Sequence, residues 1–310
     1  MEQRDLDYAS ILDIFMKAEY AITLHKYELA LELVQMALSQ IPESSVAHYT
    51  MARILLLQRR FEAAEVAFVE TLRLDPNNDL AHMLYATLLQ ELKRASQAEQ
   101  EYKIALELNP QSADAHFYYS QFLLMFRNAP STAKIHCLKV LTLEPMNAAA
   151  YAVLGQIATR EDEIPEAEAA YLKALSLDPE NPTIHNSYGV FLCDKKRNPK
   201  SALAHFRIAL MKDPKDEGYK HNLLLALKVS HSFYWLFWRF ASLRHYNKGF
   251  TLFFILTTII LVRTPWFLAQ NDRVWLPIAV VSISIFILFM LYIFTINPLL
   301  DLCLKKGWIR

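Results

Sequence analysis

Residues 61–94 read FEAAEVAFVETLRLDPNNDLAHMLYATLLQELKR, and residues 95–128 read ASQAEQEYKIALELNPQSADAHFYYSQFLLMFRN. Written one above the other, the two stretches place alanine on alanine, an aromatic residue on an aromatic residue and proline on proline at a step of 34 residues. The proline stands where one helix would end, because it cannot continue that helix and restricts the residue before it. The sequence therefore predicts a repeated helical unit of 34 residues.

The same unit recurs along most of the chain. Prolines stand 34 or 35 residues apart at Pro42, Pro76, Pro110, Pro145, Pro179 and Pro214. An alanine precedes each proline by twelve residues, at Ala30, Ala64, Ala98, Ala133, Ala167 and Ala202. A large aromatic residue follows four of these alanines at Phe68, Tyr102, Tyr171 and Phe206. Small residues let paired helices approach closely, and we expect the aromatic residues to fill the space between them.

This pattern resembles the tetratricopeptide repeat family, which has a small residue near position 8, alanine at 20, an aromatic residue at 24, alanine at 27 and proline at 32. The resemblance implies an all-α solenoid of six helix-turn-helix repeats, at residues 11–44, 45–78, 79–112, 113–147, 148–181 and 182–216. Residues 1–10 are expected as an N-terminal extension, and residues 217–230 as a capping helix. Repeats four and six each gain one residue, near Asn128 and Asn198.

The composition separates two parts of the chain. The whole chain is 54% apolar with 5 glycines and a formal net charge of zero, which excludes a disordered chain. Residues 1–216 hold 29 acidic and 22 basic side chains, whereas residues 217–310 hold 3 acidic and 10 basic ones. We therefore describe an acidic repeat region that is followed by a basic, strongly apolar tail.

Several function classes are disfavoured by the residues themselves. The chain lacks the basic excess that is typical of a nucleic-acid binder. It contains no GxSxG, HExxH, GxxxxGKS or GxGxxG motif. Its cysteines, Cys137, Cys193 and Cys303, have no CxxC spacing and fit a reducing compartment. We expect no enzyme activity, no cofactor, no metal site, no nucleic-acid partner and no small-molecule substrate.

The family resemblance also predicts a binding surface. In the family, the first helices of the repeats line a concave groove that binds peptides or partner helices. The groove residues that we expect to contact a partner are Phe15, Tyr49, Arg53, Met83, Leu84, Phe117, Tyr118, Gln121 and Asn186. We expect an apolar or amphipathic segment to bind across the aromatic members, because aromatic residues are common interface anchors. The alternative is that some of these side chains contact only neighbouring helices.

Two further patterns have a packing interpretation. Histidine recurs at position 4 of four repeats, as His48, His82, His116 and His185. Neighbouring helices pack about 8–10 Å apart, whereas zinc ligands lie about 2 Å from the metal, so packing is favoured over a metal ladder. The acidic run at residues 161–163 is expected to be a solvated turn, with a docking patch as the alternative.

Two long apolar runs lie in the tail. Residues 250–262 read FTLFFILTTIILV, and residues 274–296 read VWLPIAVVSISIFILFMLYIFTI. A spanning helix needs about 20 residues, and the first run reaches this length when it extends to Ala269 with Arg263 near the far interface. We expect transmembrane helices at 249–269 and 274–296 that form a hairpin. A re-entrant or interfacial segment is the alternative for the first.

An aromatic and basic stretch precedes the hairpin, and more cations follow it. Residues 231–248 are expected as an amphipathic helix at the headgroup level, with a last solenoid helix as the alternative. The expected membrane-interface residues are Trp235, Trp238, Arg239, Arg244, Lys248, Trp266, Trp275, Lys305 and Lys306. Because cations flank both ends of the hairpin and residues 297–310 form a basic tail, the positive-inside rule predicts that the repeats and both termini are cytoplasmic.

The order of the parts also resembles bacterial membrane proteins in which tetratricopeptide repeats run into a short hairpin. Residues 186–193 are similar to pilus-assembly tetratricopeptide proteins, although this chain has no lipobox. We expect an adaptor at the bacterial inner membrane, with a protein or peptide and the lipid bilayer as partners. The alternatives are a chaperone or receptor for apolar segments of membrane or exported proteins, a structural subunit that acts through its hairpin, and a receptor on a eukaryotic organelle.

Overall fold

The computed structural model describes the backbone of residues 2–230 and the side chains of residues 12–230. Beyond residue 230 it describes seven positions, all helical and exposed: Phe267, Pro277, Val280, Val281, Ser284, Ile287 and Leu288. The rest of the expected interfacial helix, hairpin and basic tail lies outside the described residues. The same holds for the expected interface residues Trp235, Trp238, Arg239, Arg244, Lys248, Trp266, Trp275, Lys305 and Lys306.

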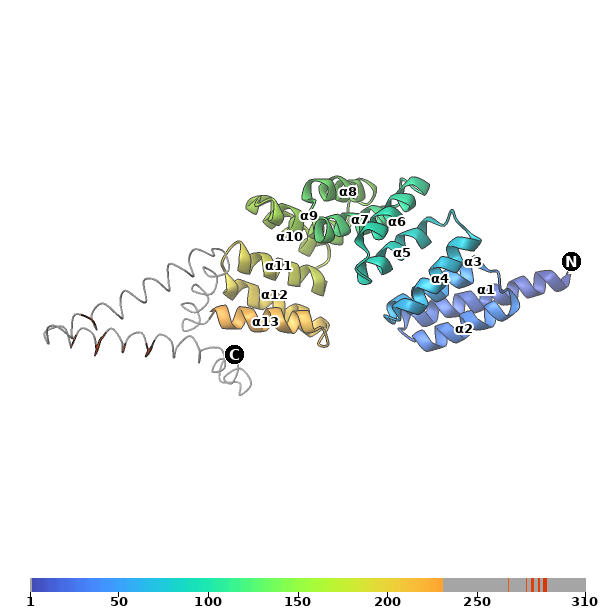
Figure 1. The fold of residues 1–310 in the computed structure, drawn as a ribbon, viewed down its shortest axis with the longest axis horizontal. Helices are drawn as coiled ribbons and strands as arrows, with labels where there is room; N and C mark the ends of the chain where they lie inside the picture. Colours follow the sequence, from blue (N-terminus) through green and yellow to red (C-terminus); the bar gives the residue numbers. More distant parts are fainter. Residues whose placement is uncertain are drawn as a thin grey trace. The chain divides into compact units, whose positions relative to one another are not determined.

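Residues 2–230 form α-helices joined by short turns, and this range contains no strand (Figure 1). In chain order the helices are α1 (Glu2–Thr23), α2 (Tyr27–Gln40), α3 (Ser45–Leu57), α4 (Phe61–Leu74), α5 (Asp79–Glu91), α6 (Ala95–Leu108), α7 (Ala113–Phe126), α8 (Pro130–Leu143), α9 (Ala148–Arg160), α10 (Ile164–Leu177), α11 (Pro182–Asp194), α12 (Pro199–Lys212) and α13 (Glu217–Ser230). The expected N-terminal extension is helical from Glu2 onward and forms the first turns of α1.

The chain divides into two compact units, Met1–Asp178 and Pro179–Arg310. The first unit holds the five helix pairs from α1/α2 to α9/α10, and the described helices of the second are α11, α12 and α13. In the second unit α13 packs against both α11 and α12. Asn222 Nδ2 donates a hydrogen bond to Asn186 Oδ1 at 2.9 Å across this packing. The segment expected to cap the last repeat is therefore a helix that covers it.

The first helix of each pair is called the A helix and the second the B helix. Each turn from A to B contains one non-glycine residue in the left-handed region, with φ between 48° and 64°, at His25, Arg59, Lys93, Asn128, Asp162 and Arg197. In repeat two the Arg60 N–H donates to the Leu55 carbonyl at 2.9 Å, five residues back, as in a Schellman turn. In repeat four the corresponding bond from Ala129 reaches Leu123, six residues back. The wider turn accommodates the extra residue that the sequence spacing indicated.

Small residues on the A helices face large residues on the B helices. A Cβ atom added to Gly189 would lie 2.7 Å from the Phe206 ring, and one added to Gly155 would lie 3.0 Å from the Tyr171 ring. Both aromatic rings are almost completely buried. The repeated small and aromatic positions are thus the two sides of one close helix contact, as the sequence predicted.

The departure at position 27 of repeat two has a local explanation. Thr71 replaces the usual alanine there and is fully buried. Its hydroxyl donates to the carbonyl of Ala67 at 2.8 Å, one turn earlier in α4. Because this bond lies within its own helix, the hydroxyl is satisfied without a partner in the core.

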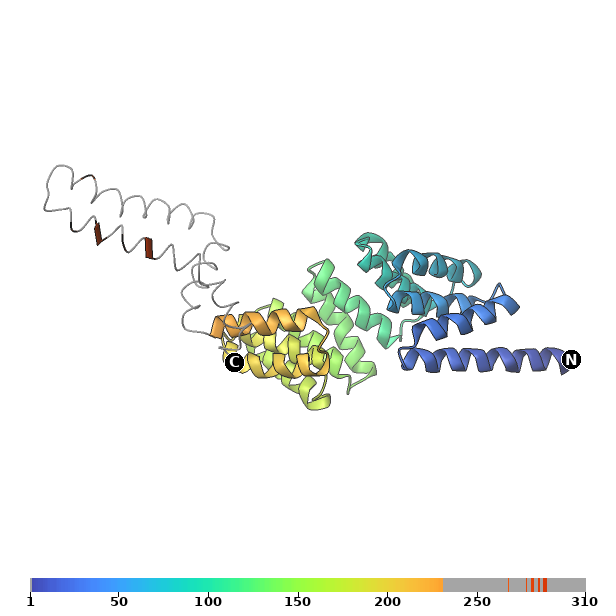
Figure 2. The same cartoon turned by 90° about the horizontal axis from the view of Figure 1, so that it is seen from below.

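Within the first unit the A helices form an inner row. Neighbouring A helices contact one another, α3 with α5, α5 with α7 and α7 with α9, whereas successive B helices do not make comparable contacts. Helices on the inner side of a curved stack lie closer together than those on its outer side. The A helices therefore line the inner face of this unit. Helix α1 lies at the edge of the unit, and its N-terminal turns extend beyond the neighbouring helices (Figure 2).

Candidate functional site

Five aromatic and apolar side chains among the expected groove residues share the same environment. They are half-buried and pack partly against the core: Phe15, Tyr49, Leu84, Phe117 and Tyr118. Each comes from an A helix of the first four repeats, and Leu84 contacts the core clusters on both of its sides. Burial raises the pKa of the Tyr49 and Tyr118 phenols, so both hydroxyls stay protonated at neutral pH and can donate hydrogen bonds. We call these five side chains the aromatic row.

Met83 was expected in the groove but lies in the core. Its side chain is 4% exposed and belongs to the cluster between repeats three and five. Ala152, the corresponding residue of repeat five, and the next residue, Val153, are also buried. Met83 and Val153 belong to the same core cluster. Position 5 of the repeat is therefore a packing position here unless it carries an aromatic ring.

Arg53 is held by two neighbours. Its guanidinium forms an ion pair with the Glu19 carboxylate of α1 and lies 5.9 Å from the centre of the Tyr49 ring. These contacts neutralise the cation and orient the ring, as in a cation–π pair. A carboxylate clamp would need a free cation at the groove, and Arg53 does not provide one.

The last two expected groove residues lie in different units. Gln121 is half-exposed on α7 in the first unit. Asn186 is on α11 in the second unit, where its side-chain oxygen is occupied by the bond from Asn222. Asn186 therefore helps to hold the capping helix α13 against α11, and the structure does not place it with the aromatic row.

The repeated histidines tie each A helix to the turn before it. Their Nε2 atoms lie 2.9–3.2 Å from the carbonyl oxygen of the proline six residues earlier, as His48 to Pro42, His82 to Pro76, His116 to Pro110 and His185 to Pro179. Because a carbonyl can only accept, Nε2 carries the proton and donates in every case. We call this arrangement a histidine bridge. No group of three metal-ligating side chains occurs among the described residues.

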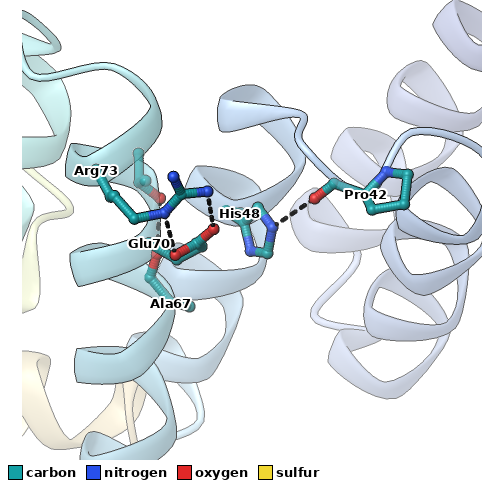
Figure 3. Close-up of polar contacts among 6 residues, drawn as sticks. Pro42, His48, Ala67, Glu70 and Arg73 are labelled. Carbon is teal, nitrogen blue, oxygen red and sulfur yellow. Dashed lines mark hydrogen bonds and ion pairs between the residues drawn. The ribbon is translucent and has the colours of Figure 1, made fainter.

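The second nitrogen of each bridge faces the B helix of the same repeat. His82 Nδ1 lies 2.6 Å from Glu101 Oε2, and His116 Nδ1 lies 2.8 Å from His136 Nδ1. In the second unit His185 Nδ1 lies 2.9 Å from His205 Nδ1. The His48 Nδ1 atom is buried without a hydrogen-bond partner. Ala67 occupies the position that Glu101 holds in the next repeat, and a methyl group offers no polar atom (Figure 3).

The hydrogen bonds determine the protonation of the bridges. His82 donates through both ring nitrogens to oxygen acceptors, so it is an imidazolium when Glu101 is ionised. Burial acts to lower the pKa of His82, but the bonds to Glu101 and the Pro76 carbonyl outweigh it and raise the pKa. His116 accepts through Nδ1 when neutral, so His136 donates to it. Burial lowers the pKa of His116, and burial together with His116 lowers that of His136 to about 4.

The sequence reasoning did not identify the B-helix partners Glu101, His136 and His205. A usable signal was present, because each stands 19 or 20 residues after the histidine of position 4. The difference of one residue follows the insertion in the turns of repeats four and six. A search for polar residues at this offset would have found all three.

The acidic turn at residues 161–163 is bridged to the preceding repeat. Lys134 Nζ on α8 lies 3.2 Å from a Glu161 oxygen and 3.1 Å from a Glu163 oxygen. Ser131 also donates to Glu161 at 3.2 Å. The turn is therefore not simply solvated, as the sequence had led us to expect. Two of its carboxylates connect the α9–α10 turn to α8.

A groove on the outer side of the first two repeats lies next to His48. Its volume is about 930 Å³, and its lining includes His48, Met51, Val66, Ala67 and Glu70. Glu70 does not complete the histidine bridge, because both of its oxygens accept bonds from the Arg73 guanidinium at 2.8 and 2.9 Å (Figure 3). The space beside Ala67 is thus open while the neighbouring carboxylate is already paired.

The two described cysteines are unreactive. Cys137 is fully buried and donates from Sγ to the Ala150 carbonyl at 3.1 Å. Burial raises the pKa of the Cys137 thiol to about 12 and that of Cys193 to about 11. The thiolate is the nucleophilic form, and neither residue supplies it at neutral pH.

Antiparallel helix pairs stacked at a 34-residue step define an α-solenoid repeat protein, a class of scaffold rather than a catalytic fold. Two family models described as tetratricopeptide repeat match the chain, one at residues 21–88 and 57–116 and the other at residues 136–182 and 154–217. Together these matches cover more than half of the chain. The chain therefore belongs to the tetratricopeptide repeat family, whose repeats serve as protein-interaction scaffolds.

Solved structures show the same fold at low sequence identity. The Cut9–Hcn1 hetero-tetramer of the APC/C matches with a TM-score of 0.62 and 17% identity, over 70% of this chain and 43% of that chain. PilW, described as a type IV pilus biogenesis factor, matches with a TM-score of 0.59 and 16% identity, over 69% and 98%. PilF of Pseudomonas aeruginosa matches with a TM-score of 0.56 and 19% identity, over 69% and 96%. No curated protein matches this sequence significantly.

Proposed function

We propose that this protein is a membrane-anchored adaptor that binds a protein or peptide partner on the inner face of its first four repeats. The observation that carries the proposal is the aromatic row. Five large side chains from consecutive A helices are only half-buried, so they keep apolar surface that a partner can cover. Half-buried aromatic residues on rigid helices are typical interface anchors, because little side-chain freedom is lost on binding.

The side chains around the aromatic row indicate what the partner presents. Arg53 is already paired with Glu19, so the face holds no strong free cation there. The Tyr49 and Tyr118 hydroxyls are protonated donors beside apolar surface. This combination suits an amphipathic helix or an extended apolar segment whose backbone carbonyls accept hydrogen bonds.

The anchoring part of the proposal is supported by the sequence of residues 231–310. The run at 274–296 is long enough to span a bilayer, and cations flank both ends of the expected hairpin. Among the residues that the structure describes, no helix combines the length and apolar character needed to cross a membrane.

The proposed location is the cytoplasmic face of a bacterial inner membrane. The distribution of cations favours cytoplasmic termini, which would place the repeats beside the cytoplasmic headgroups. The adaptor would hold its partner near the membrane and support the assembly or localisation of a membrane complex.

The test removes the aromatic row while the fold is kept. We expect the pair Tyr49→Ala and Phe117→Ala to abolish crosslinking of the full chain to its partner in intact cells, as read by mass spectrometry. The matched control is Ile135→Ala with Leu138→Ala, two exposed apolar residues on the outer helix α8, which should leave crosslinking unchanged. Circular dichroism checks that both variants fold.

Two results would contradict the proposal. A folded Tyr49 and Phe117 variant that keeps every crosslinked partner would exclude the inner face as the binding surface. Partners that consist only of nascent apolar membrane segments would replace the adaptor by the chaperone alternative, because the aromatic row would then serve transient clients.

A further inference from the structure

The A helices that carry most of the aromatic row have an excess of acidic side chains. Helices α3, α5 and α7 hold no lysine, one arginine, Arg53, and three acidic residues: Asp79, Glu91 and Asp114. Arg53 already pairs with a carboxylate of α1, and Glu91 already pairs with an arginine of the α3–α4 turn. The two other carboxylates, Asp79 and Asp114, remain.

Neither of these two carboxylates is neutralised by a cation within residues 12–230. Asp79 accepts a hydrogen bond from the side-chain amide of Asn109 at 2.8 Å, and this neutral partner leaves its charge in place. Asp114 is exposed and forms no ion pair with a residue of the same range. Both lie in the first turn of an A helix, where the helix dipole favours a negative charge but supplies no counter-ion.

Both carboxylates act on a tyrosine of the aromatic row. Asp114 precedes Tyr118 by four residues on α7, so the two side chains share one face of the helix. Burial raises the pKa of the Tyr118 phenol, and the Asp114 carboxylate raises it further. Burial also raises the pKa of the Tyr49 phenol, Arg53 opposes this rise, and Asp79 is one of the carboxylates that add to it. Negative charge therefore accompanies the apolar surface of both tyrosines.

The stacking of the helices gives the distance between the two charges. Successive A helices run in the same direction, because an antiparallel B helix separates them, and α5 contacts α7. Asp79 is the first residue of α5 and Asp114 is the second of α7, so both lie at the same edge of the A-helix row. Packed helices are about 8–10 Å apart. Three residues of an extended segment span about 10 Å, and seven residues of a helix rise by about the same distance.

We propose that the partner segment is basic as well as apolar, with apolar side chains on the aromatic row and Lys or Arg side chains paired with Asp79 and Asp114. The cations are three residues apart if the segment is extended and seven apart if it is helical. The inference rests on the proposed function, because it names the class of partner that the same surface takes. The two carboxylates also select against acidic segments, since like charges across an interface repel.

Three synthetic peptides test the charge preference. They share their leucine and phenylalanine positions and differ only in their polar residues, which are lysine, glutamine or glutamate; each is made with polar residues three apart and seven apart. Binding to the full chain in nanodiscs of zwitterionic phosphatidylcholine is measured by fluorescence polarisation, and empty nanodiscs give the background. In one of the two spacings, we expect the lysine peptide to bind about fivefold more tightly than the glutamine peptide, because exposed ion pairs contribute modestly. The glutamate peptide should bind most weakly.

Two matched double variants locate the preference. Asp79→Asn with Asp114→Asn should weaken binding of the lysine peptide about fivefold and leave the glutamine peptide unchanged. The control is Glu62→Gln with Glu166→Gln, which removes two exposed carboxylates from the first turns of the B helices α4 and α10. It changes the net charge and the helix dipoles equally, and it should leave all peptides unchanged. Equal binding of the lysine and glutamine peptides, or an equal effect of the two double variants, would overturn the inference.

The aromatic-row variant separates this inference from the proposed function. Suppose that Tyr49→Ala with Phe117→Ala abolishes peptide binding, while lysine and glutamine peptides bind the unchanged protein equally. The inner face is then the binding surface, and only its preference for cations is contradicted. If the same variant leaves binding of the lysine peptide unchanged, the aromatic row is not the surface and both are contradicted. If no peptide binds the unchanged protein, the inference fails, whereas the crosslinking test of the proposed function is unaffected.

Discussion

His48 and His82 occupy the same position in two successive repeats but differ in their chemistry. Both donate from Nε2 to a proline carbonyl at 3.0 Å. His82 also contacts Glu101 on its B helix, which acts to raise its pKa, whereas His48 faces Ala67 and its Nδ1 atom has no hydrogen-bond partner. The difference shows that the A helix specifies the backbone bond of a histidine bridge. One residue on the B helix then determines whether the bridge carries charge.

The largest expected effect is the loss of a complete bridge. His82→Ala removes the donor from the Pro76 carbonyl and leaves the Glu101 carboxylate without its partner, so we expect about 2–3 kcal/mol of destabilisation. His48→Ala removes a single hydrogen bond, from Nε2 to the Pro42 carbonyl, and should cost about 1 kcal/mol. Urea unfolding of the two variants, followed by circular dichroism, measures both values. Equal losses would show that Glu101 adds nothing to the bridge.

The pH dependence of stability is a smaller effect, and it distinguishes the His82 bridge from the two histidine pairs. The pKa of His82 is raised, so its contribution to stability is complete below the unfolded pKa of about 6.5 and is lost as pH rises through the folded value. The pKa values of His116, His136 and His205 are lowered, so their contribution is present above about 6.5 and is lost as pH falls below it. The two kinds of bridge therefore have opposite pH dependences.

Single variants isolate each dependence. His136→Asn supplies a neutral donor to His116, and it should remove about 1 kcal/mol of the stability loss between pH 7 and pH 5. Glu101→Gln keeps a hydrogen bond to His82 without favouring its charged form, so the loss on the alkaline side should disappear. The free energy of unfolding, measured at several pH values in one buffer series, gives the slopes. An unchanged slope for either variant contradicts the assignment of that bridge.

The smallest expected effect comes from giving His48 the B-helix partner that it lacks. Ala67→Glu places a carboxylate at the position of Glu101, beside the groove of about 930 Å³ that borders His48. We expect up to about 1 kcal/mol of stabilisation, because the carboxylate gives the buried His48 Nδ1 atom a hydrogen-bond partner. Ala67→Leu is the matched control, which adds a side chain without a polar atom. An equal gain from Ala67→Leu would show that new packing rather than the bridge stabilises the protein.

Most of the fold could be predicted from the sequence, because each position of the repeat corresponds to a particular contact between helices. The small and aromatic positions predicted the close contact that Gly189 and Phe206 make, and the extra residues near Asn128 and Asn198 predicted the wider turns. The division into two units after Asp178 was not predicted, because the repeat pattern continues across it. A periodic sequence specifies each pair of helices more strongly than the junctions between pairs.

The candidate site was less predictable than the fold. The position within the repeat correctly indicated which residues lie on A helices, but it did not indicate that Met83 is buried while Phe117 keeps exposed surface. Exposure there depends on the size of the neighbouring side chains, which belong to other repeats. Likewise, the pairing of Arg53 with Glu19 joins residues 34 positions apart. Such contacts follow from the stacking of repeats and have no local signature in sequence.

The left-handed residues in the A-to-B turns have a consequence for protein engineering. Glycine is the residue that most easily adopts this conformation, yet the described turns use charged residues, histidine or asparagine instead. Lys93→Gly would remove the steric cost of a side chain at φ 60°. Part of this gain is offset because glycine raises the conformational entropy of the unfolded chain, so we expect a net stabilisation of a few tenths of a kcal/mol. The turns therefore form a set of sites at which the melting temperature can be raised in small steps.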